Sequence, residues 1–453
     1  MNKTIEKIKS RAKKAAALGL ALLLTLAALS PACSPKETAQ QGKPDTGKTD
    51  APITAAPNQN GGGEAVNLSA GVKANKVSGK EADEAFITAQ TGFALELFKN
   101  SLKEGKNSLV SPLSVMLALA MTANGANGET LEGMEKALGG IDIDELNGYL
   151  YSYMKCLNSS DQAKLLAANS IWTNSNAPFT VRESFLQKNA DYYGADIYKA
   201  EFNDETLDAI NEWVSEGTDG MIDKILDEIS PSAVMYLVNT LLFEAEWSSK
   251  YFDHNVTEGE FTAYNGEKRG AELMRSTEYA YLEDERATGF IKPYLGNYAF
   301  AALLPNEGVD IYDYIAGLNG ESLAGILKNA RDDYMVNATL PKFSFDFSAE
   351  LKDALKKMGM ESAFDSANAD FTNMFDCEKG DVFISRVIHK TRIEVGEQGT
   401  KAGAATLVEM FAGSAYPGED RIKTVTLDRP FVFMIIEMET NIPLFIGTLT
   451  DLG

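Results

Sequence analysis

The sequence predicts an α+β fold, in which helices come first and strands dominate the later part of the chain. Apolar residues with helical spacing recur before residue 220, whereas wholly apolar or alternating runs follow from residue 233 onward. With 453 residues, 44% of them apolar, the chain is long enough to bury a large core and too apolar to be disordered.

The charge and the cysteine count exclude several functions. A net charge of −23 and an isoelectric point near 4.6 argue against binding to nucleic acid or to an anionic membrane surface. Three cysteines exclude a disulfide scaffold, and the spacing of Cys156 and Cys377 leaves the state of both thiols open. Two histidines leave little room for a histidine-rich metal site, and nothing in the sequence predicts a metal or a cofactor.

Residues 1–32 have the pattern of an export signal. Six cations precede residue 15 against the single acid Glu6, and an uninterrupted apolar run covers 15–29, which is short for a membrane span. The small residues before Cys33 resemble a bacterial lipoprotein cleavage site. Cys33 is therefore expected to be lipidated and to anchor the protein at the cell surface, with secretion into the extracellular medium as the alternative.

Residues 33–80 are expected to form a flexible tether, because they are rich in Pro, Gly, Gln and Thr and show no apolar period. A phosphate-loop pattern at 42–49 lies inside this tether. Pro44 interrupts it, and no strand or helix flanks it to make a nucleotide site. No further linker appears from 81 to 453, which predicts a single domain.

The domain 81–453 begins with helices. Ser111 followed by Pro112 is a typical helix start, and Asn124 followed by Gly125 is a typical end. Helices are expected at 81–102, 113–122, 128–138, 183–193, 206–218 and 349–358. Strands are expected at 233–243, 261–263, 279–282, 299–304, 335–340, 382–395, 431–437 and 444–449.

Two of these strands have clear patterns. The run 233–243 is almost wholly apolar, as in a central strand that is buried on both faces. The run 382–395 alternates, with one face formed by Val387, His389, Thr391, Ile393 and Val395 and the other by Lys390, Arg392 and Glu394. This alternation predicts one buried face, on which His389 would be a hydrogen-bonded core histidine.

Eight short motifs follow one another through the domain. They are NSLVSPLSV at 107–115, NSIW at 169–172, NEWV at 211–214, LVNT at 237–240 with Phe243 and Trp247, VIHK at 387–390, VGEQGT at 395–400, RPFVF at 429–433 and PLFIG at 443–447. Each is weak alone, but in this order and spacing they resemble the serpin family over nearly the whole domain. The resemblance implies a large mixed central β-sheet with further sheets, about eight or nine helices and an exposed reactive loop near the C-terminus.

The same resemblance implies a monomeric protease inhibitor that is not an enzyme. In the family a protease cleaves the reactive loop, here around 397–416, an acyl-enzyme forms, and the loop inserts as a strand into the central sheet. The family spacing places the cleaved bond sixteen residues after Glu397, between Gly413 and Ser414, to within about three residues. A small residue before this bond favours an elastase- or subtilisin-like serine protease, or a papain-like cysteine protease, as the partner.

The loop residues themselves are compatible with a strand that becomes buried. By the resemblance, the hinge and inserting residues are Glu397, Gly399, Thr400, Ala402, Ala404, Ala405 and Thr406. Every second residue from Thr400 to Met410 is uncharged, whereas Lys401 and Glu409 fall on the other parity. No proline occurs between 395 and 416, so the inserted strand would lack no backbone donor there. A flexible loop without insertion is the alternative.

The resemblance also assigns supporting residues. A polar cluster beneath the point where the sheet parts would consist of Ser111, Ser114, Asn239 and His389. Lys342 would pair with the hinge acid Glu397. Trp247 would cover the top of the opening, known as the breach.

Two other functions compete with this interpretation. Ser152 and Lys155 fit a serine–lysine hydrolase pattern, but the partner motifs of such enzymes are absent from the sequence. A non-inhibitory serpin-fold lipoprotein, acting as a binding protein or a chaperone, is the stronger rival. Its loop would be expected to carry charge or proline on the inward parity, which this loop does not.

Overall fold

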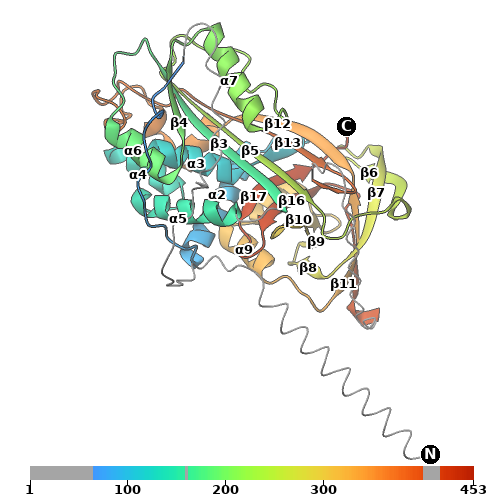
Figure 1. Ribbon diagram of the computed structural model, residues 1–453. Helices are drawn as coiled ribbons and strands as arrows, with labels where there is room; N and C mark the ends of the chain where they lie inside the picture. Colours follow the sequence, from blue (N-terminus) through green and yellow to red (C-terminus); the bar gives the residue numbers. More distant parts are fainter. Residues whose placement is uncertain (1–64, 159–161, 401–418) are drawn as a thin grey trace, which may run out of the picture. The chain divides into compact units, whose positions relative to one another are not determined.

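The computed structural model describes residues 65–158, 162–400 and 419–453. In this part of the chain nine α-helices and three β-sheets confirm the predicted α+β class, with a large mixed sheet and two further sheets (Figure 1). The helices are α2 (Glu84–Ser101), α3 (Pro112–Ala123), α4 (Gly128–Ala137), α5 (Ile143–Leu157), α6 (Glu183–Tyr192), α7 (Asp204–Gly217), α8 (Ile311–Gly317), α9 (Gly320–Lys328) and α10 (Lys352–Leu355).

Sheet A is the large mixed sheet. In spatial order its strands are β1 (Val66–Asn67), β4 (Asp196–Ala200), β3 (Ala163–Asn174), β5 (Met235–Glu246), β14 (Gly399–Thr400), β13 (Arg386–Val395) and β12 (Phe343–Glu350). β3 runs parallel to β4 and β5 runs parallel to β13, whereas the other pairings are antiparallel.

The two further sheets follow the later part of the chain. Sheet B contains β2 (Ser108–Val110), β17 (Pro443–Leu449), β16 (Phe431–Glu437), β10 (Tyr298–Pro305), β9 (Ala287–Pro293) and β8 (Ala280–Glu283). Sheet C contains β15 (Ile422–Thr426), β11 (Met335–Pro341), β7 (Lys268–Glu278) and β6 (Val256–Thr262). Strands β10, β16 and β17 are buried along their whole length, so they form the interior of the domain.

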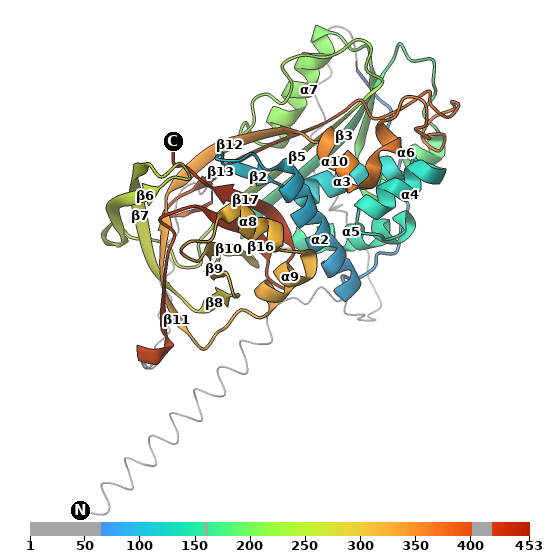
Figure 2. The same cartoon turned by 180° about the vertical axis from the view of Figure 1, so that it is seen from behind.

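Sheet A is covered on both faces, because alternate residues of its strands enter two different cores. Leu237 and Val387 belong to the larger core, which includes the apolar residues of α3. Tyr236 and Ile388 belong to a smaller core beneath α7. α7 packs against β3 and β5 (Figure 1), and α3 lies on the other side of these strands (Figure 2). This burial on both faces agrees with the apolar pattern predicted for β5.

Side-chain caps explain where several helices begin. Asp83 and Asn203 each accept the N–H of the residue three positions on, at 3.0 Å, and so cap α2 and α7. Ser111 occupies the N-cap position of α3 with Pro112 in the first turn, as predicted. Its hydroxyl makes no cap bond, however, and donates to the carbonyl oxygen of Leu444 in sheet B at 3.1 Å.

Several predicted element boundaries are wrong; the strand expected at 261–263, for example, overlaps only the end of β6. Ala349 and Glu350, expected in a helix, pair with β13 and end β12. The helical turn that follows is α10, which continues as a π-helical turn at Lys356–Met360. The strand expected from residue 382 begins at Arg386, where pairing with β5 starts.

The folded part begins earlier than the predicted boundary at residue 81. Val66 and Asn67 form β1 and pair with β4, although they lie in the stretch expected to be a tether. The N–H of Asn75 donates to a carboxylate oxygen of α6 at 2.7 Å, and that of Lys80 donates to a carbonyl oxygen of α5 at 2.9 Å. The polar composition hid these contacts, because backbone groups make most of them.

None of the helices α2 to α10 of the described chain is both long and apolar enough to cross a bilayer. The predicted signal and the first part of the tether, residues 1–64, lie outside the described residues.

Candidate functional site

The candidate site lies between the parallel strands β5 and β13 of sheet A. At one end these strands pair directly through three residue pairs, the first being Arg386 with Tyr236. At the other end β14 lies between them, with Thr400 paired to Ala245 of β5 and to Val395 of β13. β14 is antiparallel to both neighbours, and it lies between them at this end of the two strands.

The turn that delivers β14 requires glycine at one position. The N–H of Gly396 donates to the carbonyl oxygen of Gly399 at 3.0 Å, which closes the turn. A Cβ atom on Gly399 would lie 2.1 Å from the carbonyl oxygen of Ala245. Only a residue without a side chain therefore lets the turn lie against β5.

The hinge, residues 396–400, is held by the chain that follows β5. The backbone and indole N–H groups of Trp247 donate to two carbonyl oxygens of the hinge, at 2.9 and 2.8 Å. The N–H of Tyr251 donates to a third, at 3.1 Å. Trp247 is buried and stacks on Tyr294, with ring centroids 4.2 Å apart. We call Trp247, Tyr251 and Tyr294 the hinge seat.

Thr400 lies on the inward parity that the alternation predicts. Its side chain is buried, and its hydroxyl is hydrogen-bonded to that of Tyr294 at 2.5 Å. Burial raises the pKa of Tyr294, which keeps this phenol protonated and able to hydrogen-bond. The first inserted side chain is thus already in a satisfied polar contact inside the sheet.

Lys342 lies between two carboxylates at the same end of the sheet. It forms ion pairs with Glu397, the residue that the resemblance gives as its partner, and with Glu272, whose oxygen is 2.8 Å away. Burial has the largest single effect on the pKa of Glu397 and raises it. The hydrogen bond from Lys342, a backbone hydrogen bond and the charge of Lys342 together outweigh burial, so that pKa lies below its usual value. Both side chains are partly exposed, so the pair contributes about 1 kcal/mol or less.

The four residues expected to form a polar cluster lie together beneath sheet A. The N–H of Ser111 donates to Nε2 of His389 at 3.0 Å, and the side-chain amide of Asn239 donates to the carbonyl oxygen of Ser114 at 2.6 Å. The Ser114 hydroxyl donates to the carbonyl oxygen of Ser111 at 3.2 Å. The cluster connects β5 and β13 to the start of α3.

His389 is neutral in this cluster. Burial lowers its pKa to about 4. Because Nε2 accepts a hydrogen bond, the ring proton is on Nδ1, which meets no acceptor among the described residues. A second proton would place an unpaired charge in the core, so protonation opposes folding.

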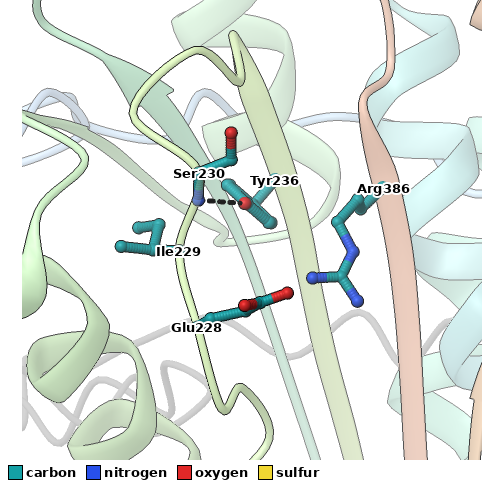
Figure 3. Close-up of a pocket in the computed structure, with 5 residues that line it drawn as sticks. All are labelled: Glu228, Ile229, Ser230, Tyr236 and Arg386. Carbon is teal, nitrogen blue, oxygen red and sulfur yellow. Dashed lines mark hydrogen bonds between the residues drawn. The ribbon is translucent and has the colours of Figure 1, made fainter.

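A pocket of about 440 Å³ lies at the end where β5 and β13 pair (Figure 3). Tyr236 and Arg386 line it from the two strands, and the connection between α7 and β5 lines it from above through Glu228, Ile229 and Ser230. The N–H of Ser230 donates to the Tyr236 hydroxyl at 3.0 Å. The connection is therefore bonded to β5, one of the two strands that would have to separate if β14 grew to full length.

Several expected site residues lie outside the described residues. They are Cys33, Ala402, Ala404, Ala405, Thr406, Gly413 and Ser414. Cys377 has a free thiol, and burial raises its pKa to about 11, so it is protonated at neutral pH.

Sequence reasoning missed two members of the hinge seat. Tyr251 and Tyr294 contact the hinge across more than 100 residues of chain, and neither belongs to the motifs that carry the resemblance. The signal that could have located Tyr294 is the hydroxyl of Thr400 at an inward position, because a buried hydroxyl requires a hydrogen-bond partner.

The comparisons with known proteins agree with this geometry. The family model described as Serpin (serine protease inhibitor) matches residues 88–452. An uncharacterized serpin-like protein of Thermococcus kodakarensis is 31% identical over 381 residues, covering 82% of this chain and 87% of the relative. The human leukocyte elastase inhibitor is 29% identical over 385 residues, covering 80% of this chain and 98% of the relative.

A solved structure is similar over the same part of the chain. The native state of the thermophilic serpin tengpin has a TM-score of 0.81 and 48% sequence identity. The match covers 86% of this chain and 100% of that one.

Proposed function

Because the chain belongs to the serpin family, we propose that it inhibits proteases as a suicide substrate. Membership of this family, with relatives such as the leukocyte elastase inhibitor, supports protease inhibition in general. In the proposed mechanism the nucleophile of the protease forms an ester or thioester with the Gly413 carbonyl, and the new amino group of Ser414 leaves. β14 then extends through sheet A before water releases the acyl-enzyme.

The position of β14 is the observation that carries this proposal. Gly399 and Thr400 already lie between β5 and β13, antiparallel to both. The residues that follow them would gain ladder hydrogen bonds to β5 and β13 in alternation, so the added strand would be paired along both edges. The parity that begins with the buried Thr400 places small uncharged residues inward, which limits the desolvation cost of insertion.

The target protease is proposed from the loop sequence. A glycine before the cleaved bond favours a shallow apolar specificity pocket, as in elastase-like or subtilisin-like serine proteases or in a papain-like cysteine protease. We further propose that the protein acts outside the cell, anchored through a lipid on Cys33 at the end of a tether. The export pattern of residues 1–32 supports this location.

Incubation with elastase and with subtilisin tests the proposed function. We expect a covalent complex that survives SDS, and mass spectrometry should find the new C-terminus of the inhibitor within about three residues of Gly413. The cleaved inhibitor should also resist heat better than the intact protein, since its sheet has gained a strand.

Clean loop cleavage without a complex, and without a gain in heat resistance, would contradict the proposal. That outcome would favour the non-inhibitory binding or chaperone-like role. Cleavage with a gain in heat resistance but no complex would also count against inhibition of the protease tested, and other proteases of the proposed classes would then be assayed in the same way.

A further inference from the structure

A buried ion pair lies next to the hinge seat. Lys292 at the end of β9 and Glu278 at the end of β7 are 2.9 Å apart, between Nζ and Oε1, and their side chains are 1% and 7% exposed. Among the ion pairs of the described residues, this is the most deeply buried. Removing two charges from water is costly, so a buried ion pair is weak evidence for stability alone and suggests a role in positioning.

Lys292 contacts the chain that holds the hinge. Its ammonium group donates to the carbonyl oxygen of Ser249 at 3.0 Å. It also lies over the rings of Tyr251 and Trp247, at 4.4 and 5.4 Å from their centroids, where the negative ring faces attract a cation. One cation therefore fixes both aromatic residues and the backbone between them.

Glu278 completes this arrangement from the opposite side. Its Oε1 accepts a hydrogen bond from the Ser276 hydroxyl at 2.6 Å, and Ser276 is hydrogen-bonded to the Tyr251 hydroxyl at 3.3 Å. The carboxylate thus reaches Tyr251 through Ser276 as well as through Lys292. The charge of Glu278 and burial both raise the pKa of Tyr251, burial having the larger effect.

Trp247 and Tyr251, which contact this ion pair, also donate hydrogen bonds to the hinge. Trp247 donates two hydrogen bonds to hinge carbonyl oxygens and Tyr251 donates a third. The structure therefore contains a continuous set of contacts from the buried charges, through residues 247–251, to the turn that delivers β14.

We propose that Lys292 and Glu278 are a positioning pair that keeps the hinge paired with β5, so that β14 is ready to extend when the loop is cleaved. This inference rests on the proposed inhibitory function. Ordering the hinge costs conformational entropy. In this arrangement the hinge is already ordered before a protease binds, so that insertion is faster. A faster insertion leaves less time for water to hydrolyse the acyl-enzyme and release the protease.

The variant that tests the pair is Lys292→Met combined with Glu278→Gln. Both replacements have nearly the same size as the originals, so the space stays filled while both charges are removed. The single Lys292→Met variant is less informative, because it leaves a buried carboxylate without a partner. The matched control is Lys268→Met with Glu260→Gln, which neutralises an exposed pair on β7 and β6 whose atoms are 2.7 Å apart.

Hydrogen exchange of the intact protein, without any protease, gives the first measurement. We expect the amides of residues 396–400 to exchange at least about tenfold faster in the double variant than in the wild type, while the β3–β5 ladder is unchanged. The hinge amides of the control variant, Lys268→Met with Glu260→Gln, should exchange as fast as those of the wild type. Equal hinge exchange in the double variant and the wild type would overturn the inference.

A milder variant covers the case in which the double variant does not fold. Ser276→Ala removes one of the two links between Glu278 and Tyr251, the one through the Ser276 hydroxyl, and keeps both charges. It should accelerate hinge exchange by a smaller factor, about threefold. No change in this variant would likewise contradict the inference.

The second measurement uses a protease that the wild type traps. The number of inhibitor molecules consumed for each protease trapped should rise severalfold in the double variant and stay constant in the control. An unchanged number would overturn the inference. If the wild type traps no protease, the proposed function fails, while hydrogen exchange still decides whether the ion pair positions the hinge.

Discussion

The two ends of the gap between β5 and β13 are closed by different means. At the end near the hinge, β14 separates the strands, and aromatic rings and charged groups surround it. At the opposite end the strands pair directly, beside a neutral cluster of Ser111, Ser114, Asn239 and His389. The first end already has the arrangement that an inserted strand needs, whereas the second end must open.

Under the proposed mechanism this difference assigns separate tasks to the two ends. The hinge end would control whether insertion starts, because Gly399 and Thr400 would be the first residues of the new strand. The opposite end would control whether the sheet stays closed until then, because its hydrogen bonds link β5 and β13 to α3. Variants at the hinge end should therefore alter trapping of the protease, and variants at the other end should alter the stability of the intact protein.

The largest effect is expected from Thr400→Arg at the hinge end. A guanidinium group in place of the buried hydroxyl would have no partner beside Tyr294. Its burial should cost more than about 1.4 kcal/mol, enough to reduce trapped complex at least about tenfold. Gel electrophoresis in SDS after incubation with the protease measures this loss. Glu394→Arg, at an exposed position on β13, is the control and should still trap; full trapping by Thr400→Arg would contradict the insertion model.

Gly399→Ala should have the next largest effect. The added Cβ would collide with the carbonyl oxygen of Ala245, which should destabilise the pairing of β14 with β5 by about 1–3 kcal/mol. Detachment of β14 should in turn make insertion slower. Faster hydrogen exchange at residues 399–400 and a higher number of inhibitors consumed for each protease trapped would both show this. Gly396→Ala is a close control, because a Cβ there meets no atom within 4 Å. If both variants behave alike, the close approach is not the cause.

His389 should make the intact protein sensitive to acid. Its folded pKa of about 4 lies below the unfolded value of 6.5, so the unfolded state binds a proton first as the pH falls. The contribution of His389 to the free energy of unfolding is therefore fully present above pH 6.5. This contribution decreases between pH 6.5 and 4, by at most about 1.4 kcal/mol for each pH unit. Denaturant unfolding at several pH values measures this slope.

The acid effect has its own controls. His389→Gln should be less stable than the wild type at neutral pH and should lack this part of the slope. His254→Gln, at an exposed position, should keep it. An identical slope in His389→Gln and the wild type would mean that other groups cause the acid sensitivity.

The smallest effect is expected at the ion pair of Lys342 and Glu397. Both side chains are partly exposed, so Glu397→Gln should lower the free energy of unfolding by about 1 kcal/mol or less. The loss should shrink further at high salt, because screening weakens exposed pairs. A much larger loss, unaffected by salt, would show that Glu397 has a structural role beyond this pair.

The sequence predicted two strands of sheet A whose local pattern is clear. β13 buries the face that contains His389 and exposes Arg392 and Glu394 on the other, because side chains of a strand alternate. β5 is buried on both faces, as its apolar run indicates. The family resemblance assigned Lys342 to the hinge acid and Trp247 to the breach, and both contact the hinge in the structure.

The helix α5 was not predicted although its pattern is local, whereas two other features that were missed depend on contacts between distant segments. Lys292 lies in a strand whose neighbours are apolar, and nothing near it in the chain indicates that Glu278 will neutralise it. β1 was missed for a similar reason, because Val66 and Asn67 acquire a partner only when β4 lies beside them. The spacing of apolar residues along the chain indicates which side chains are buried. It does not indicate which distant residue each of them contacts, because that depends on the tertiary arrangement.

The close approach of Gly399 to β5 fixes the start of the proposed reactive loop, because a side chain at this position would meet the backbone of Ala245. Gly413 lies fourteen residues later in the chain. If the proposed function holds, new protease specificities should be selectable by varying the sequence near residue 413 while 396–400 is kept constant. The protein would then be a scaffold in which the recognition sequence and the hinge can be altered separately.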